Sequence, residues 1–165
     1  MAALAEPEPL RGGDGATVSA LASPPLRRRR WRRPALAVLA LLAAYPAFVL
    51  SAVYAQWFGA NLPGGRNGPA DAYRHSLASA IVAYTLSPRC VDWVTAVMER
   101  GGEGNPSRAM DAHNNRIGAR LGAAAPTWAA MQREVRAAVD HGAIDARSPD
   151  QITWRVPETW QERLY

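Results

Sequence analysis

The sequence predicts an all-α protein, a small helical bundle of about four helices that follows one N-terminal transmembrane helix. Two observations carry this prediction. Residues 34–55 contain no charged side chain and are mostly apolar. About twenty such residues, each rising about 1.5 Å, cross a hydrocarbon core of about 30 Å. Beyond residue 59, apolar residues recur at helical spacing in segments bounded by Pro, Ser, Thr and Gly.

The basic charge of the chain is concentrated at its N-terminus. All nineteen basic residues are Arg, and residues 1–33 hold seven of them against three acidic residues. Residues 34–165 hold twelve Arg against eleven acidic residues, so the folded part is nearly neutral. A nucleic-acid-binding surface needs basic residues clustered on the domain itself. The sequence therefore predicts no nucleic-acid partner.

The Arg-rich segment and the apolar run together predict a membrane topology. Positive residues before a span keep that end in the cytoplasm. We expect a disordered Arg-rich cytoplasmic tail at 1–33, a signal-anchor helix at 34–56 that contacts a lipid bilayer, and a small helical domain outside the cytoplasm at 59–165. A cleaved signal peptide is the open alternative, because Val53, Tyr54 and Ala55 satisfy the small-residue pattern at a cleavage site.

Four short helices are expected after a turn-rich connector. Their approximate ranges are 70–86, 87–100, 105–122 and 127–142, and Pro69 suits the first turn of the first helix. The second helix has an apolar stripe of Val91, Val94, Val97 and Met98. The remaining tail is expected to be extended, with Trp154 and Trp160 covering the core.

Polar side chains interrupt the first and third of these helices in the same pattern. The segments DAYRHSLA and DAHNNRIG each begin with Asp, carry two polar residues one turn later and end on a small residue. At about 100° per residue, the polar positions of each helix fall on one stripe. These positions are Asp71, Arg74 and His75 in the first helix, and Asp111, Asn114 and Asn115 in the third.

The two stripes are expected to face each other. The small residues Ala78 and Gly118 allow a close helix crossing, and buried polar groups need hydrogen-bond partners. We therefore expect a buried Asp opposite Arg74 and the Asn amides opposite His75. By the same arithmetic, His113 falls on another face that is expected to be exposed to water.

The blocks DAYRHS and MDAHNNRIG, with a glutamate at the end of the helix between them, resemble a bacterial domain family of unknown function. Members of that family carry DAFRHA-like and MDLHNNxxG-like blocks, and the resemblance covers about residues 66–122. Its members occur as small envelope proteins and as modules of larger secreted proteins. With the topology above, the resemblance implies a single-pass protein of a bacterial inner membrane, with its C-terminal domain in the periplasm. In many members a histidine precedes the middle glutamate, whereas Met98 precedes Glu99 here. The resemblance implies no established reaction.

Two functions remain open for the polar stripes. In the first, the domain is a hydrolase acting on an envelope component. His75 is its general acid or base, oriented by Asp71 or Asp111, and Arg74 stabilises a developing negative charge. Glu99 or Glu103 is a second acid or base, and a metal version would use His75, both Asp residues and a glutamate as ligands.

In the second function, the same groups form a structural network in a non-catalytic domain that binds a protein partner. The candidate site residues in either case are Asp71, Arg74, His75, Glu99, Asp111, Asn114 and Asn115. The sequence predicts no cofactor-binding residues. It leaves open whether a metal is bound and which substrate or partner is recognised.

Overall fold

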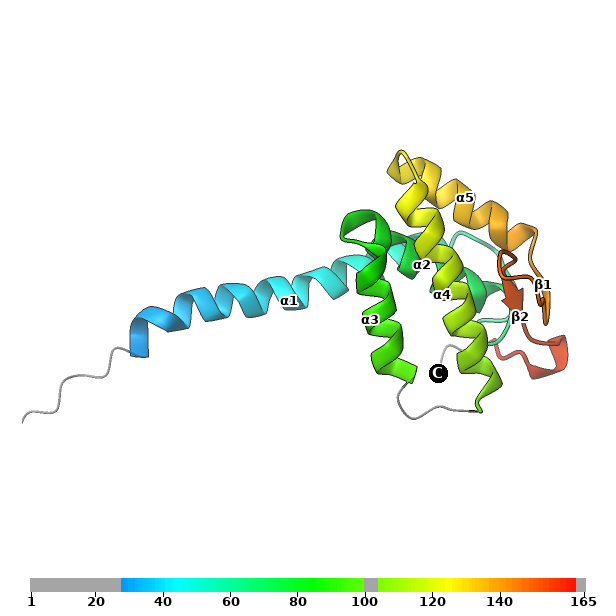
Figure 1. The fold of residues 1–165 in the computed structure, drawn as a ribbon, viewed down its shortest axis with the longest axis horizontal. Helices are drawn as coiled ribbons and strands as arrows, with labels where there is room; N and C mark the ends of the chain where they lie inside the picture. The colour runs from blue at the N-terminus through cyan, green and yellow to red at the C-terminus, as the bar shows by residue number, and fades with distance from the viewer. Residues whose placement is uncertain (1–27, 100–103, 163–165) are drawn as a thin grey trace, which may run out of the picture. The chain divides into compact units, whose positions relative to one another are not determined.

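The structure is a computed structural model that describes residues 28–99 and 104–162, without the side chains of residues 28–33, 41 and 97–99. Within this part of the chain, Figure 1 shows a mostly helical fold, which confirms the predicted class. Its elements are α1 (Arg28–Trp57), α2 (Pro69–Thr85), α3 (Pro88–Glu99), α4 (Pro106–Ala124), α5 (Trp128–Asp140), β1 (Ala143–Ile144), β2 (Thr153–Trp154) and the 3-10 helix η1 (Pro157–Thr159).

The helix α1 contains the predicted apolar run. Its 24 residues Pro34–Trp57 are long and apolar enough to cross a membrane. Large apolar side chains such as Leu36, Leu39 and Leu42 are exposed along it. Residues 28–33 of the predicted tail belong to α1, and residues 1–27 lie outside the described residues.

The C-terminal half of α1 packs against the domain. Val49 and Val53, one turn apart, are buried in the same apolar cluster as residues of α2 and α5. The Tyr45 hydroxyl forms a 2.7 Å hydrogen bond with the Thr85 hydroxyl. The Trp57 indole donates a 2.8 Å hydrogen bond to the Ala70 carbonyl. This half of α1 therefore runs antiparallel to α2 and contributes to the apolar core of the domain.

The helix α2 is central, because it contacts α3, α4, α5 and β2 (Figure 1). Its crossing with α4 depends on two glycines of α4. A Cβ atom built on Gly118 would lie 2.1 Å from the Ser76 carbonyl oxygen, and one on Gly122 would lie 2.1 Å from the Ala80 oxygen. The close crossing predicted at Gly118 is therefore present, but Ser76 and Ala80 form the contact on α2 in place of the predicted Ala78.

The helix starts follow local capping chemistry. The Asn105 side chain accepts a hydrogen bond from the Ser107 amide at the start of α4, and Thr127 does the same for the Ala130 amide at α5.

The apolar face of α5 is fully packed, with Met131 and Val135 inaccessible to solvent.

The helix α3 is less buried than its apolar stripe suggested. Val91 is buried, but Val94 is 46% exposed. The stripe is therefore only partly covered where α3 meets α2 and α4. Val97 and Met98, the other two residues of the stripe, lie among the side chains outside the described part.

The C-terminal tail forms a short parallel pair of strands, β1 and β2. In this pair Ala143 is opposite Thr153 and Ile144 is opposite Trp154. Trp154 packs against the main apolar cluster, in agreement with its predicted covering role. The Trp160 ring lies over Gly64, where an added Cβ atom would come within 3.1 Å of it.

Candidate functional site

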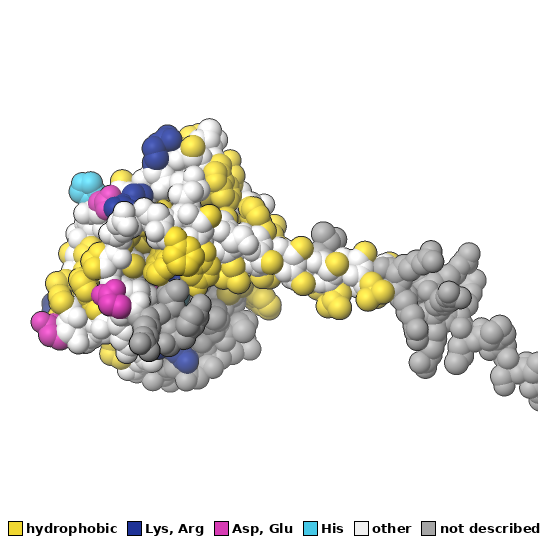
Figure 2. Space-filling model, turned by 180° about the vertical axis from the view of Figure 1, so that it is seen from behind, with side chains coloured by type: hydrophobic (Ala, Val, Ile, Leu, Met, Phe, Trp, Pro, Cys, Tyr) yellow, Lys and Arg dark blue, Asp and Glu magenta, His cyan; other side chains and the backbone are white. Residues whose placement is uncertain are grey.

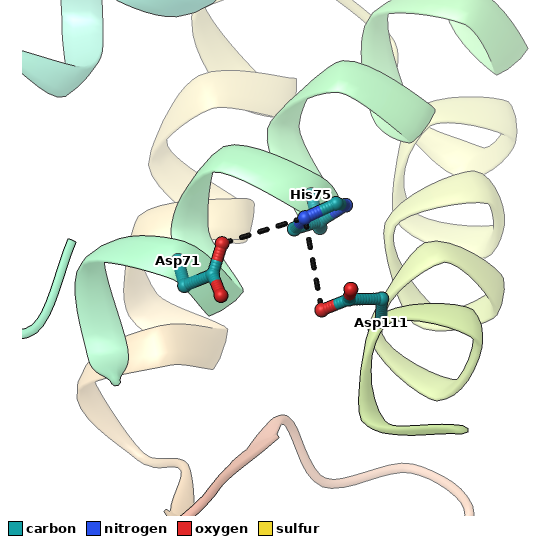
Figure 3. A group of neighbouring side chains, drawn as sticks. All are labelled: Asp71, His75 and Asp111. Atoms are coloured by element: carbon teal, nitrogen blue, oxygen red, sulfur yellow. Dashed lines mark ion pairs between the residues drawn. The ribbon is translucent and has the colours of Figure 1, made fainter. Parts of the chain in front are cut away.

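Three ionisable side chains from α2 and α4 converge at the crossing of these helices (Figure 3). Asp71 and His75 are one turn apart on α2, so both side chains lie on the same face of that helix. The His75 Nε2 atom lies 3.4 Å from Asp71 Oδ1 and 3.6 Å from Asp111 Oδ1. The Asp71 side chain is 4% exposed, whereas those of His75 and Asp111 are 31% and 27% exposed.

Asp71 is held as an ionised carboxylate by close donors. Its Oδ2 atom accepts a 2.6 Å hydrogen bond from the backbone amide of Asn67, and its Oδ1 atom pairs with the Arg74 guanidinium. Arg74 also donates to the Gly65 carbonyl at 3.3 Å. Burial acts to raise the pKa of Asp71, but the contact and charge of His75, with Arg74 and Asn67, lower it below the ordinary value.

Asp111 is in the opposite situation. Its Oδ1 atom is buried and has no hydrogen-bond partner among the described residues. The pKa of Asp111 is raised to about 6, chiefly by burial. The charge of His75 acts to lower this pKa, and the charge of Asp71 acts to raise it. Two carboxylates beside one imidazole thus have pKa values shifted in opposite directions, an arrangement that suits acid–base chemistry.

The same atoms have the spacing of metal ligands. His75 and the two Asp residues each offer a donor atom, and these atoms lie within 4.8 Å of one another. A divalent ion takes such nitrogen and oxygen ligands at about 2.1 Å. Both oxygens of Asp71, however, already accept hydrogen bonds from Asn67 and Arg74. A cation at this position would therefore share Asp71 Oδ1 with the positively charged Arg74 guanidinium, which repels it, so we favour acid–base chemistry over metal binding.

A family model described as a domain of unknown function (DUF6973) matches residues 30–143, a range that runs from α1 into β1. The chain belongs to this family. No curated protein and no solved structure matches the chain. The predicted resemblance to a domain of unknown function is therefore confirmed. Membership of DUF6973 assigns no reaction, so the function has to be inferred from the site.

The two asparagines of this DUF6973 domain do not pair with His75 as predicted. Asn114 is fully buried, and its amide donates to the Thr153 carbonyl at 2.8 Å and accepts from the Thr153 amide at 3.0 Å. Asn115 accepts a 2.9 Å hydrogen bond from the Ser79 hydroxyl. The asparagines therefore connect α4 to β2 and to α2.

Arg74 also differs from its prediction, because it pairs with Asp71 on its own helix and not across the crossing with Asp111. His75 is the residue opposite Asp111. Glu99 ends α3, but its side chain lies outside the described part of the chain, as does Glu103.

Two neighbours of the site carried little signal in the sequence. Asn67 holds Asp71 through its backbone amide and has a φ of 63°, a conformation that Asn tolerates. Its place in an Asn-Gly pair signals a turn but not a contact. His113, predicted to lie outside the site, is half-buried, with its Nε2 atom 2.9 Å from the Gln151 carbonyl oxygen.

Proposed function

We propose that this domain is a hydrolase that acts on a component of the bacterial cell envelope, with His75 as its general base and Asp111 as its general acid. One observation carries the proposal. The imidazole of His75 lies between a buried, fully paired carboxylate and a second carboxylate whose buried Oδ1 atom has no hydrogen-bond partner among the described residues and faces only the imidazole at 3.6 Å. A group needed only for structure would normally have such an oxygen satisfied.

Asp71 supports the role of His75 as a base. An ionised carboxylate beside Nε2 favours the tautomer in which that nitrogen carries the proton. The Nδ1 atom then keeps its lone pair and can accept a proton from a water molecule. Arg74 and Asn67 keep Asp71 ionised and in place, so we assign them to the support of His75.

Asp111 supplies the complementary acid. A carboxyl group with a pKa of about 6 stays partly protonated near neutral pH. Such a group can donate a proton to a leaving group and is then returned to its protonated state by solvent. The partial exposure of both Asp111 and His75 gives a substrate access to the pair. No role is assigned to the asparagines, because their amides are engaged with Ser79 and Thr153.

The test is cleavage of envelope material by the purified full chain in detergent micelles. Peptidoglycan, phospholipid and peptide preparations are offered to the wild type, to His75→Ala and to a matched control, His113→Ala. We expect the His75→Ala change to lower the rate about 10²-fold or more, which is typical for loss of a general base. His113→Ala should retain the rate, because the His113 ring forms its hydrogen bond with the Gln151 carbonyl of the C-terminal segment and not with the Asp71–His75–Asp111 cluster.

The same samples are also unfolded by heat to separate chemistry from folding. His75→Ala should stay within a few degrees of the wild type, whereas Asp71→Ala should lower the melting temperature clearly, because it leaves Arg74 without its partner. If the wild type cleaves nothing with or without added Mn²⁺ or Zn²⁺, a non-catalytic domain that binds a protein partner becomes the better interpretation. Cleavage that EDTA abolishes and Mn²⁺ restores would favour the metal version of the site.

A further inference from the structure

The apolar helix α1 is free of the domain over only part of its length. From Tyr45 to Trp57 it lies along α2, with Tyr45 at Thr85 and Trp57 at Ala70. The apolar residues before this packed half are 34–44, which rise about 16 Å. A hydrocarbon core is about 30 Å thick. The free part is therefore too short to cross a bilayer if the domain stands clear of the lipid.

The packed half of α1 keeps an apolar outer face. Val49 and Val53 point into the core, but Phe48 is 46% exposed and Leu50 is 55% exposed. Side chains of this kind are stable in lipid and unfavourable in water. The apolar surface of the helix therefore continues past the point at which the domain begins.

An apolar patch of the domain adjoins α1 at this point. We define the patch by Phe48, Tyr84, Leu86 and Trp128. The Trp128 ring lies 6.1 Å from Phe48 and 5.9 Å from Tyr84 between ring centroids. Leu86 follows Thr85, the residue bonded to Tyr45, and is 56% exposed. Figure 2 shows hydrophobic side chains continuing from α1 onto the adjoining surface of the domain.

We propose that this patch is a lipid-contacting surface that lies in the interfacial layer of the bilayer entered by α1. Tyr and Trp are enriched at that depth, because their rings are apolar and their polar groups stay hydrated. With the patch in this layer, the residues of α1 just beyond Tyr45 also lie within the bilayer. The length of α1 inside the bilayer then comes closer to the thickness of the hydrocarbon core. The domain is then held against the membrane by α1 and the patch together.

The test measures the depth of two labelled positions in the full chain, reconstituted in phosphatidylethanolamine–phosphatidylglycerol liposomes. In a Cys90→Ser background, Leu86→Cys places a fluorescent label in the patch. The matched control is Glu158→Cys in η1, an exposed position. The η1 segment lies at the opposite end of α2, where the Thr159 carbonyl accepts a hydrogen bond from Asn67. Each label is quenched separately by nitroxide lipids and by aqueous iodide.

We expect nitroxide lipids to quench the label at residue 86 several-fold more than the label at residue 158, and iodide to show the reverse order. Equal access of iodide to both labels would overturn the proposal, and so would equal quenching of both by lipid. Failure of the chain to float with the liposomes would overturn it as well. Melting temperatures close to that of the Cys90→Ser parent check that both labelled chains are folded. None of these results depends on hydrolase activity.

Discussion

Asp71 and Asp111 are the same residue type on either side of one imidazole, yet they have opposite electrostatic environments. Asp71 is the more deeply buried of the two but accepts a backbone hydrogen bond and an Arg ion pair. Asp111 has a buried oxygen that receives neither from the described residues. Specific donors thus outweigh depth of burial in setting the two pKa values.

The raised pKa of Asp111 predicts a pH-dependent stability. The folded chain releases this proton near pH 6, whereas an unfolded Asp releases it near 3.8. Between these values the folded state binds more protons, so wild-type stability should fall as pH rises from about 4 to 6. Asp111→Asn removes this penalty and should be about 3 kcal/mol more stable than the wild type at pH 7, with the advantage disappearing below pH 4.

Denaturant unfolding in detergent at a series of pH values measures this difference. The control is Asp150→Asn, because the Asp150 side chain is 81% exposed in its pair with Arg120. Its effect should be small. An Asp111→Asn difference that stays constant from pH 4 to 7 would contradict the assigned environment.

At the scale of elements, the position of the site depends on how closely α4 approaches α2. Gly118 and Gly122 are one turn apart on α4, and both touch the backbone of α2. Asp111 lies about two turns before Gly118 on the same helix, so the crossing sets its distance from His75. Small residues thus act on the chemistry indirectly, by letting the two helices approach.

Substitution of Gly118 by a residue as small as Ala should therefore lower the stability of the fold substantially. In Gly118→Ala the new Cβ atom would meet the Ser76 carbonyl oxygen at 2.1 Å, and this oxygen belongs to backbone that cannot rotate away. We expect a loss of about 3 kcal/mol in the free energy of unfolding, because the helices must separate. Arg116→Ala, on the exposed face of α4, should change it by less than about 0.5 kcal/mol.

Thermal or denaturant unfolding of the two variants measures the effect. A Gly118→Ala chain as stable as Arg116→Ala would mean that the helices are not in backbone contact at this point. His75→Ala in the Gly118→Ala background adds a further check. Its small effect on stability should persist, because His75 does not form the crossing.

At the scale of the whole molecule, the chain combines an apolar helix with a domain that shares its core. Val49 and Val53 belong at once to the candidate span and to the buried cluster of the domain. If the patch around Trp128 meets the bilayer, the Asp71–His75–Asp111 cluster lies toward the other end of α2. About ten residues of helix then separate the cluster from the lipid, or about 15 Å. This distance favours a substrate outside the acyl-chain region.

The predicted orientation is tested with reporters fused after Tyr165. A reporter that is active only outside the cytoplasm should be active there, because the Arg residues before the span retain the N-terminus inside. Deletion of residues 27–33 should reduce or scramble this orientation. Activity of a cytoplasm-specific reporter at Tyr165 in the intact chain would refute the topology.

Much of the helical architecture could be predicted from the sequence, because helix formation is largely local. Periodic apolar residues and capping residues such as Asn105 and Thr127 act within a few positions of the helix that they start. The close approach of α2 and α4 was also predictable. A Gly within a polar stripe indicates a contact between helices as clearly as an apolar side chain does.

The sequence by itself determined that this protein has an apolar N-terminal helix, a helical domain and two polar stripes that meet. Only the tertiary structure decided the partner of each side chain. Asn114 bonds Thr153, which is 39 positions away, and Val53 enters the core while Leu50 in the same apolar run stays exposed. Helical periodicity determines which residues share a face. It carries no information about the distant segment that comes to cover that face, because that choice depends on how the helices pack.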